Sequence, residues 1–172
     1  MKKLFAILLA LCLCLSTALA QEPVKMETVE IDGFIGFAVP AEWEGMEVKT
    51  EEAENGMLVL ARNPEHTMMF VMNYTLAGMG LTPEMAVQEL NADGTYSVLE
   101  VVENQHGMKV IRFQFADGSI AGCYVLDQYG LLYAFSYGYL DGTLITPEDA
   151  VVNQLVEDTI ASVFPSEKEM PQ

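Results

Sequence analysis

Apolar and polar residues alternate most regularly between residues 108 and 140, which predicts three consecutive β-strands. These strands are Met108–Ala116, Ser119–Asp127 and Leu131–Leu140. Asp117-Gly118 joins the first two, and this dipeptide readily supplies the positive φ of a two-residue hairpin turn. Because successive side chains point to opposite faces of a strand, the third strand gathers its aromatic rings on one face. That face consists of Leu131, Tyr133, Phe135, Tyr137 and Tyr139.

Shorter runs of the same alternation predict further strands. They are Met26–Ile31, Phe34–Val39, Met46–Thr50, Met57–Arg62, His66–Thr75 and Thr95–Glu103. Asp32-Gly33 and Asn55-Gly56 are hairpin signals, so the acidic run Glu51–Glu54 is expected at a solvated hairpin tip. Short strands joined by tight turns predict an antiparallel sheet of about six to eight strands.

Helical spacing occurs in two places. Thr82-Pro83-Glu84 offers an N-cap, a proline at the first helical position and an acid in the first turn, which predicts a helix from Pro83 to Asn91. The same Thr-Pro-Glu-x-Ala-Val string returns at Thr146, through an old duplication or one turn used twice, and predicts a helix over Pro147–Phe164. The longer helix has an apolar stripe that needs a sheet face to cover, and the aromatic face is the natural candidate. The stripe consists of Val152, Leu155, Val156, Thr159, Ile160 and Val163.

Residues 1–20 predict a signal peptide. Two lysines precede an apolar run from Leu4 to Leu15, and Ala18-Leu19-Ala20 matches a signal peptidase site. The run is too short for a comfortable membrane-spanning helix. Cys12 and Cys14 lack the small residue that precedes a lipidated cysteine, so we expect a secreted or periplasmic protein rather than a lipoprotein. The expected order is a disordered lead-in at 21–25, one domain at 26–165 and a polar tail at 166–172.

The chain is strongly acidic. It has 25 acidic and 8 basic residues, a net charge of −17, and cleavage after Ala20 removes two of the lysines. Such a surface repels nucleic acid and anionic lipid, so nucleic-acid binding is excluded from the expected functions. A soluble, self-repelling surface is the simplest interpretation, and basic proteins or cations are conceivable partners.

No motif of catalysis is present. Cys123 is the one cysteine left after cleavage, and its place within a strand predicts a buried small side chain rather than a nucleophile. Only His66 and His106 could act as imidazole bases, and neither a G-x-S-x-G nor an H-E-x-x-H motif occurs. We therefore expect no catalytic residue and no cofactor. An extracytoplasmic hydrolase is an alternative, because so many acids make some close carboxylate pair inevitable.

Metal binding is a second alternative. Thioethers with one imidazole suit copper(I), and the strand from His66 holds Met68, Met69 and Met72. Met69 points away from the other three, however, and methionine also fills gaps in apolar cores. The Glu51–Glu54 run lacks the spacing of a calcium loop, so no metal site is predicted.

Tyrosines on the aromatic strand are the candidate ligand-binding residues. Tyr133, Tyr137 and Tyr139, with Tyr124 from the neighbouring strand, present apolar rings and polar tips that suit a sugar or a peptide. The competing interpretation is that these rings are the floor of the core beneath the C-terminal helix. Trp43 lies just past a strand end, where it either closes the edge of the core or anchors a partner.

Two loose motifs resemble those of a known family. Phe34-Ile35-Gly36-Phe37-Ala38-Val39 is followed by Pro40 and Trp43, and the last helix ends Ile160-x-x-Val163-Phe164. This arrangement resembles the PsbP-like superfamily, which includes small bacterial exported proteins of unknown function. The resemblance implies an α+β sandwich, an antiparallel sheet with two helices packed on it. It also implies an exported, non-enzymatic accessory or binding domain. Together with the tyrosines, this makes an extracytoplasmic protein, a peptide or a sugar the expected partner.

Overall fold

Two antiparallel sheets and three helices form the described part of the chain. The computed structural model describes residues 24–31, 34–76, 81–118, 120–126 and 131–166. Every strand pair in both sheets is antiparallel and the helices pack outside the sheets, so the fold is α+β, as the sequence predicts. The predicted signal peptide, the Asp32-Gly33 turn and the turn at 127–130 lie outside the described residues.

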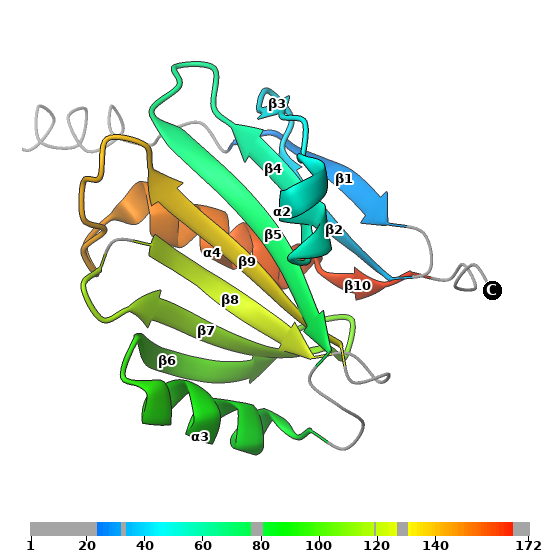
Figure 1. The fold of residues 1–172 in the computed structure, drawn as a ribbon, viewed down its shortest axis with the longest axis vertical. Coiled ribbons are helices and arrows are strands. Elements are labelled where there is room, and N and C mark those ends of the chain that lie inside the picture. Colours follow the sequence, from blue (N-terminus) through cyan, green and yellow to red (C-terminus); the bar gives the residue numbers. More distant parts are fainter. Residues whose placement is uncertain (1–23, 32–33, 77–80, 119, 127–130, 167–172) are drawn as a thin grey trace, which may run out of the picture.

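The larger sheet has seven strands in the order β3-β4-β5-β9-β8-β7-β6 (Figure 1). Their bounds are Glu44–Gly45 (β3), Met57–Arg62 (β4), Met68–Leu76 (β5), Tyr96–Glu103 (β6), Lys109–Phe115 (β7), Ile120–Leu126 (β8) and Leu131–Tyr139 (β9). The predicted meander is confirmed, because β7 pairs with β8 and β8 with β9, all antiparallel. Gly118, with φ of 74°, stands in the turn between β7 and β8. The aromatic strand β9 thus lies at the centre of the sheet, between β8 and β5.

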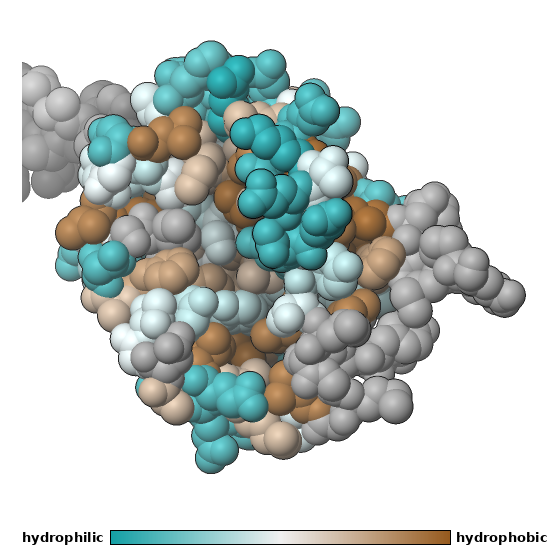
Figure 2. All heavy atoms as spheres, in the orientation of Figure 1, coloured by the Kyte–Doolittle hydropathy of each residue, from teal (hydrophilic) through white to brown (hydrophobic). Residues whose placement is uncertain are grey.

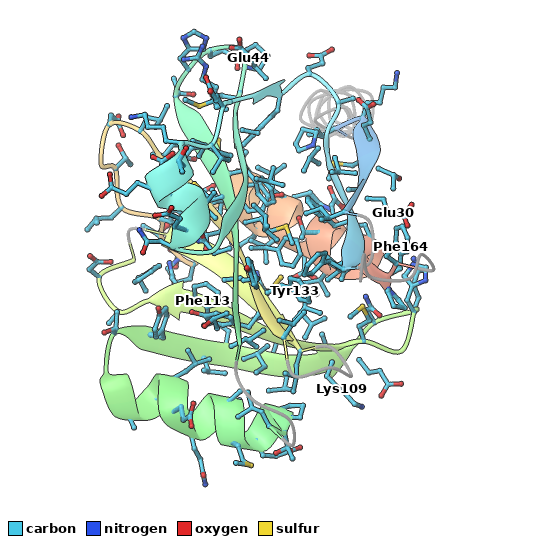
Figure 3. The ribbon with its side chains drawn as sticks, turned by 45° about the vertical axis from the view of Figure 1, so that its right-hand side comes forward. Glu30, Glu44, Lys109, Phe113, Tyr133 and Phe164 are labelled. Atoms are coloured by element: carbon cyan, nitrogen blue, oxygen red, sulfur yellow. The ribbon has the colours of Figure 1, made fainter. Side chains whose placement is uncertain are left out.

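The smaller sheet has three strands in the order β1-β2-β10. Their bounds are Met26–Ile31 (β1), Ile35–Pro40 (β2) and Phe164–Pro165 (β10). Phe164 pairs with Gly36, so β10, which follows the last helix, lies beside β2. Glu30 and Phe164 are labelled together beside this sheet in Figure 3.

Helix α4 (Ala150–Ser162) covers the aromatic face of the larger sheet and lies behind it in Figure 1. The Tyr137 and Thr159 hydroxyls are 2.8 Å apart across this interface, so the prediction that the C-terminal helix covers these rings is confirmed. Phe37 of β2 completes the core, with its ring centroid 5.1 Å from that of Phe135. The predicted apolar stripe is buried: Val152, Leu155, Val156, Thr159, Ile160 and Val163.

Helix α3 (Pro83–Asp93) packs through Ala86 and Leu90 against Ile111 of β7, on the other face of the sheet. Thr82 caps it as predicted, since the Thr82 hydroxyl accepts a hydrogen bond from Met85 N at 3.3 Å. Gly94 follows the helix with φ of 70°, the usual left-handed ending of a helix.

The acidic run that was expected at a hairpin tip is a third helix, α2 (Thr50–Glu54), and this corrects the predicted count of two helices. Lys49 N donates to the Glu52 carboxylate at 2.9 Å, and Glu51 and Glu52 occupy the first turn. Acids are stabilised there by the helix dipole. A helix this short shows no periodicity in the sequence, which is why the pattern missed it. Hydrophilic side chains cover this region in Figure 2.

The two Thr-Pro-Glu strings do not fold alike. At the second one the helix begins at Ala150, and Asp149 rather than Thr146 is its cap, with its carboxylate accepting from Val152 N at 3.0 Å. The predicted start at Pro147 is therefore wrong, because Asp149 lies closer to the apolar stripe. The predicted end at Phe164 is also wrong, because Phe164 pairs with β2 instead.

Gly36 is required because the ring of Phe164 lies directly over it, where a Cβ atom would overlap the ring. We expect Gly36→Ala to destabilise the fold by about 2 kcal/mol through overpacking. In a Phe164→Ala background the same change should cost well under about 1 kcal/mol. The difference between the two costs is the coupling energy, which a double-mutant cycle measures by denaturant unfolding. Equal effects in both backgrounds would contradict this packing.

Candidate functional site

A groove of about 640 Å³ runs along α4, on the side that faces β1 and β2. Val24 and Val151 lie in it and are 47 % and 39 % exposed, so the groove has apolar surface open to solvent. Gln105, Gln154 and Asp158 contribute the polar part of its wall. The remaining lining residues are Met26, Ala38, Ala150, Leu155, Ala161 and Ser162.

A second groove of about 400 Å³ adjoins the first, because both are lined by Val24, Val151 and Leu155. Trp43 and Met68 add apolar surface to this second part. We call the two parts together the α4 groove. Pro40 fixes the start of the turn that places the tryptophan, since Trp43 N donates to Pro40 O at 3.0 Å. The Trp43 ring meets the Tyr137 ring edge-on, at 5.9 Å and 83°, so Trp43 closes the core edge and also lines the groove.

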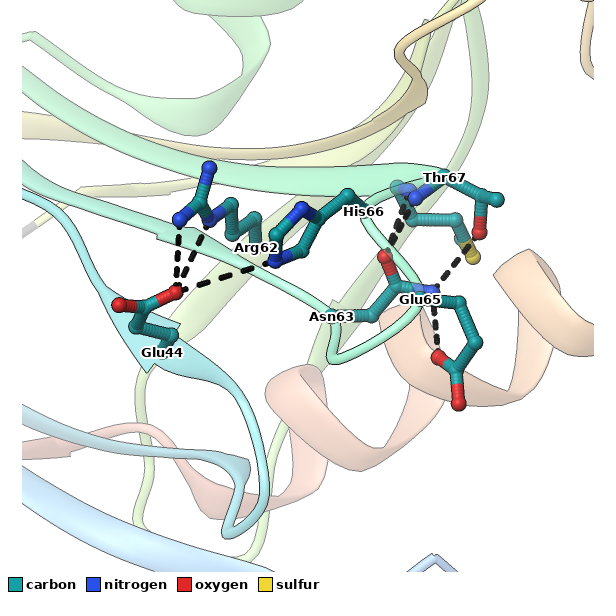
Figure 4. A network of polar contacts seen from close by, with 7 residues as sticks. Glu44, Arg62, Asn63, Glu65, His66 and Thr67 are labelled. Carbon is teal, nitrogen blue, oxygen red and sulfur yellow. Dashed lines mark hydrogen bonds and ion pairs between the residues drawn. The ribbon is translucent and has the colours of Figure 1, made fainter.

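The turn from Asn63 to Thr67 holds one wall of the α4 groove (Figure 4). Asn63 Oδ1 accepts hydrogen bonds from Thr67 N and Met68 N, both at 2.8 Å. Asn63 Nδ2 donates to Thr67 Oγ1 at 2.9 Å and to Glu65 Oε2 at 3.1 Å. One buried amide therefore satisfies the whole turn, and the wall beside Met68 is preformed.

Outside this wall, Glu44 lies beside the side chains of Arg62 and His66 (Figure 4). Arg62 donates to Glu44 Oε2 from both Nε and Nη2, at 3.0 and 2.8 Å. The hydrogen bond and charge of Arg62 hold the pKa of Glu44 below its usual range. His66 Nε2 is 4.0 Å from the same oxygen, so this candidate base faces a carboxylate rather than a hydroxyl or thiol that it could activate.

The candidate tyrosines occupy three different environments. Tyr133 and Tyr137 are buried in the core, and Figure 3 shows Tyr133 well inside the molecule. Tyr124 lies on the opposite face of the sheet, in a ring cluster with Phe113 at 4.6 Å and Tyr96 at 5.9 Å. Tyr139 OH donates to Asp149 Oδ2 at 2.9 Å. The four rings do not form one exposed surface, and of the five residues singled out from sequence only Trp43 lines the α4 groove as the described residues form it.

The Tyr139–Asp149 contact predicts loss of stability at high pH. Burial, together with the Asp149 carboxylate, raises the pKa of Tyr139 from its ordinary value of 10.0 to about 12. Since the unfolded chain loses this proton first, the stabilisation is complete below pH 10 and is lost as the pH rises to about 12. The free energy of unfolding, measured with denaturant, should fall more steeply with pH over this interval for the parent protein than for Tyr139→Phe. Parallel curves for the two proteins would contradict the prediction.

The Cys123 thiol is not available as a nucleophile in this fold. Cys123 is fully buried, and burial raises the pKa of its thiol far above the ordinary value, so it is not a thiolate at neutral pH. Met68 and Met72 are buried in the core, whereas His66 is exposed. Within the described ranges, no three His, Cys, Asp or Glu side chains gather in a way that could hold a metal ion.

Arg112 is the centre of a separate polar cluster between the sheet and α4. Its guanidinium contacts Glu157 at 2.9 Å, Glu100 at 3.3 Å and Asn153 Oδ1 at 2.7 Å. Two carboxylates thus neutralise it and tie β6 and β7 to the helix. A groove of about 570 Å³ lies beside this cluster, but the Arg112 guanidinium in its wall is already bound to Glu157, Glu100 and Asn153.

Comparison with known proteins gives no function. No family model matches the chain, and no curated protein matches it. One solved structure, a protein from Bacteroides thetaiotaomicron at 1.50 Å resolution, is similar with a TM-score of 0.48 and 14 % identity, over 85 % of this chain and 50 % of that one. The chain therefore spans half the length of that protein, and a likeness this distant carries no functional argument. No helix among the described residues is both long and apolar enough to cross a bilayer.

Sequence reasoning missed most of the α4 groove. Val24 was assigned to a loose lead-in, and Val151 fell outside the apolar stripe of the last helix. The available signal was the pair Val151-Val152, since two adjacent valines on a helix cannot both face the same sheet.

Proposed function

We propose that the protein is an exported, non-enzymatic accessory or binding domain with a PsbP-like sandwich fold, and that it binds its partner in the α4 groove. The observation that carries this proposal is the continuity of the two groove parts through Val24, Val151 and Leu155. Apolar surface with a polar rim is the usual composition of a binding site.

The chemistry of the described residues supports binding rather than catalysis. The Cys123 thiol is buried and protonated. His66 faces the Glu44 carboxylate, and His106 contacts the amide of Gln105 and the ring of Phe164. These neighbours offer no nucleophile for an imidazole to activate. The Asn63 turn supports the proposal further, because a preformed wall lowers the entropic cost of binding.

Binding in the groove is tested by capture from an extract of the cell envelope of the producing organism. Val151→Glu places a charge on the apolar lining without entering the core, because the side chain is 39 % exposed. We expect it to reduce capture of a specific component at least tenfold, about 1.4 kcal/mol. Leu144→Glu, at an apolar side chain that is 55 % exposed and outside the groove lining, is the matched control and should leave capture unchanged. Equal capture by all three proteins would remove the groove from the proposal.

Export is supported by the basic start and the apolar run of residues 1–20. We expect cells that express the full chain to release a protein whose N-terminus is Gln21, as read by Edman sequencing or mass spectrometry. Replacing Ala20 by Gln should block processing. An intact N-terminus on protein recovered outside the cytoplasm would contradict the cleavage site.

A further inference from the structure

β1 is an edge strand of the smaller sheet, and half of its backbone groups point away from β2. Hydrogen-bonded and non-hydrogen-bonded pairs alternate along an antiparallel ladder. Ala41 N donates to Lys25 O at 2.8 Å, which makes Lys25–Ala41 a bonded pair. The next pair along the ladder, Met26 with Pro40, is therefore non-bonded, and so is every second pair after it. The remaining non-bonded pairs are Thr28 with Ala38 and Glu30 with Gly36.

Three independent features of β2 agree with this assignment. Pro40 has no N–H to give to β1. Ala38 N donates instead to Ser162 Oγ at 2.9 Å. Gly36 pairs on its other side with Phe164. The N–H and C=O groups of Met26, Thr28 and Glu30 consequently point to the outer edge of the sheet, where no described strand pairs with them.

This outer edge adjoins the α4 groove, because Met26 belongs to β1 and also lines the groove. Side chains directly opposite each other on neighbouring strands lie on the same face, about 5 Å apart. A strand added outside β1 would therefore place the side chain opposite Met26 beside the apolar lining of the groove. One extended segment could therefore pair its backbone with β1 and also place side chains in the α4 groove.

Charge selects among the possible segments. Glu27 and Glu30 are both exposed on β1, Glu30 on the same face as Met26 and Glu27 on the opposite face, and Asp158 lies in the wall of the groove. Ser166 Oγ donates to Glu30 Oε1 at 2.7 Å, and the Glu30 side chain nevertheless stays exposed. In a chain of net charge −17 these carboxylates oppose the approach of a second copy and attract a cation.

We propose that β1 accepts an extended basic peptide segment by strand addition, with alternate apolar side chains of the peptide entering the α4 groove beside Met26 and its lysines or arginines on the opposite face of the strand, beside Glu27. This inference rests on the proposed function, since it uses the same groove. It adds the chemical class of the partner and the way in which the backbone is held.

The test uses protein recovered from cells that express the full chain, and an acetylated, amidated peptide of alternating lysine and valine as the probe. Thr28→Pro removes an outward N–H while leaving the β1–β2 ladder its own donors, and Thr28→Val is the matched control that keeps the N–H. We expect Thr28→Pro to weaken peptide binding at least tenfold and Thr28→Val to bind as the parent does. A matched peptide of alternating glutamate and valine should not bind.

Amide hydrogen exchange, read by NMR, reports on the backbone even if Thr28→Pro unfolds the protein. Peptide should slow exchange at Thr28 and Glu30, whose N–H groups point outward, and leave Val29 unchanged, because its N–H is already bonded to β2. One outcome overturns strand addition but leaves the groove proposal intact. In that outcome, Val151→Glu abolishes peptide binding, Thr28→Pro leaves it unchanged, and the peptide protects neither the Thr28 nor the Glu30 amide. Absence of binding by the lysine peptide, or protection of these amides by raising the concentration of the protein alone, overturns the inference as well.

Discussion

Gly122→Ala is expected to destabilise the protein by at least about 3 kcal/mol, the largest effect of any methyl group that we can place. Gly122 lies in β8 between Phe113 and Ser136 of its two neighbouring strands. A Cβ atom there would fall inside the van der Waals radius of the Phe135 carbonyl oxygen. That atom is backbone in the central strand of the sheet, so it cannot rotate away as a side chain would.

The measurement is urea unfolding of the two proteins, followed by circular dichroism. Gly45→Ala is the control, because a Cβ at Gly45 meets nothing within 4 Å and its φ is not positive. We expect that variant to stay within about 0.5 kcal/mol of the parent. If both alanines have the same small effect, the strands at Gly122 must be farther apart than described.

Asn104→Ala is expected to lower the free energy of unfolding by about 3 kcal/mol, because four hydrogen bonds end on this one side chain. Asn104 Nδ2 donates to Val163 O at 2.7 Å and to Ile160 O at 2.9 Å. Asn104 Oδ1 accepts from His106 N and Met108 N, both at 3.0 Å. The residue thus shapes the turn between β6 and β7 and also binds the last carbonyls of α4, which a helix leaves unsatisfied.

The control is the neighbouring Gln105→Ala, which loses two exposed hydrogen bonds, from Gln105 Nε2 to Ala161 O at 2.9 Å and between Gln105 Nε2 and His106 Nε2 at 3.3 Å. We expect it to change stability by less than about 1 kcal/mol. Thermal unfolding ranks the two variants. Similar melting temperatures for both would mean that the α4 carbonyls find water when Asn104 is removed.

The sequence predicted those elements whose own residues carry a period. β7 alternates apolar and polar residues, β9 alternates rings with small side chains, and the stripe of α4 repeats at helical spacing, so these elements were placed within a few residues. It failed where a distant partner decides. Phe164 reads as one more helical residue until Gly36 is known to lie beneath it. Thr146 reads as a cap until Asp149 is seen to bind both Val152 N and the Tyr139 hydroxyl.

The candidate site was harder to predict for the same reason. The aromatic strand attracted attention because its composition is unusual, yet Tyr133 and Tyr137 are there to fill the core. The α4 groove forms where β1, the Asn63 turn and α4 meet, and these segments are far apart in the sequence. Its lining consists of ordinary valines and one tryptophan, so only their juxtaposition distinguishes them.

Asn104 donates hydrogen bonds to Ile160 O and Val163 O, so the turn after β6 is joined to the end of α4. Helix α4, which covers the aromatic face, follows all seven strands of the larger sheet in the sequence. The nascent chain therefore keeps this aromatic face open to water until α4 has been synthesised.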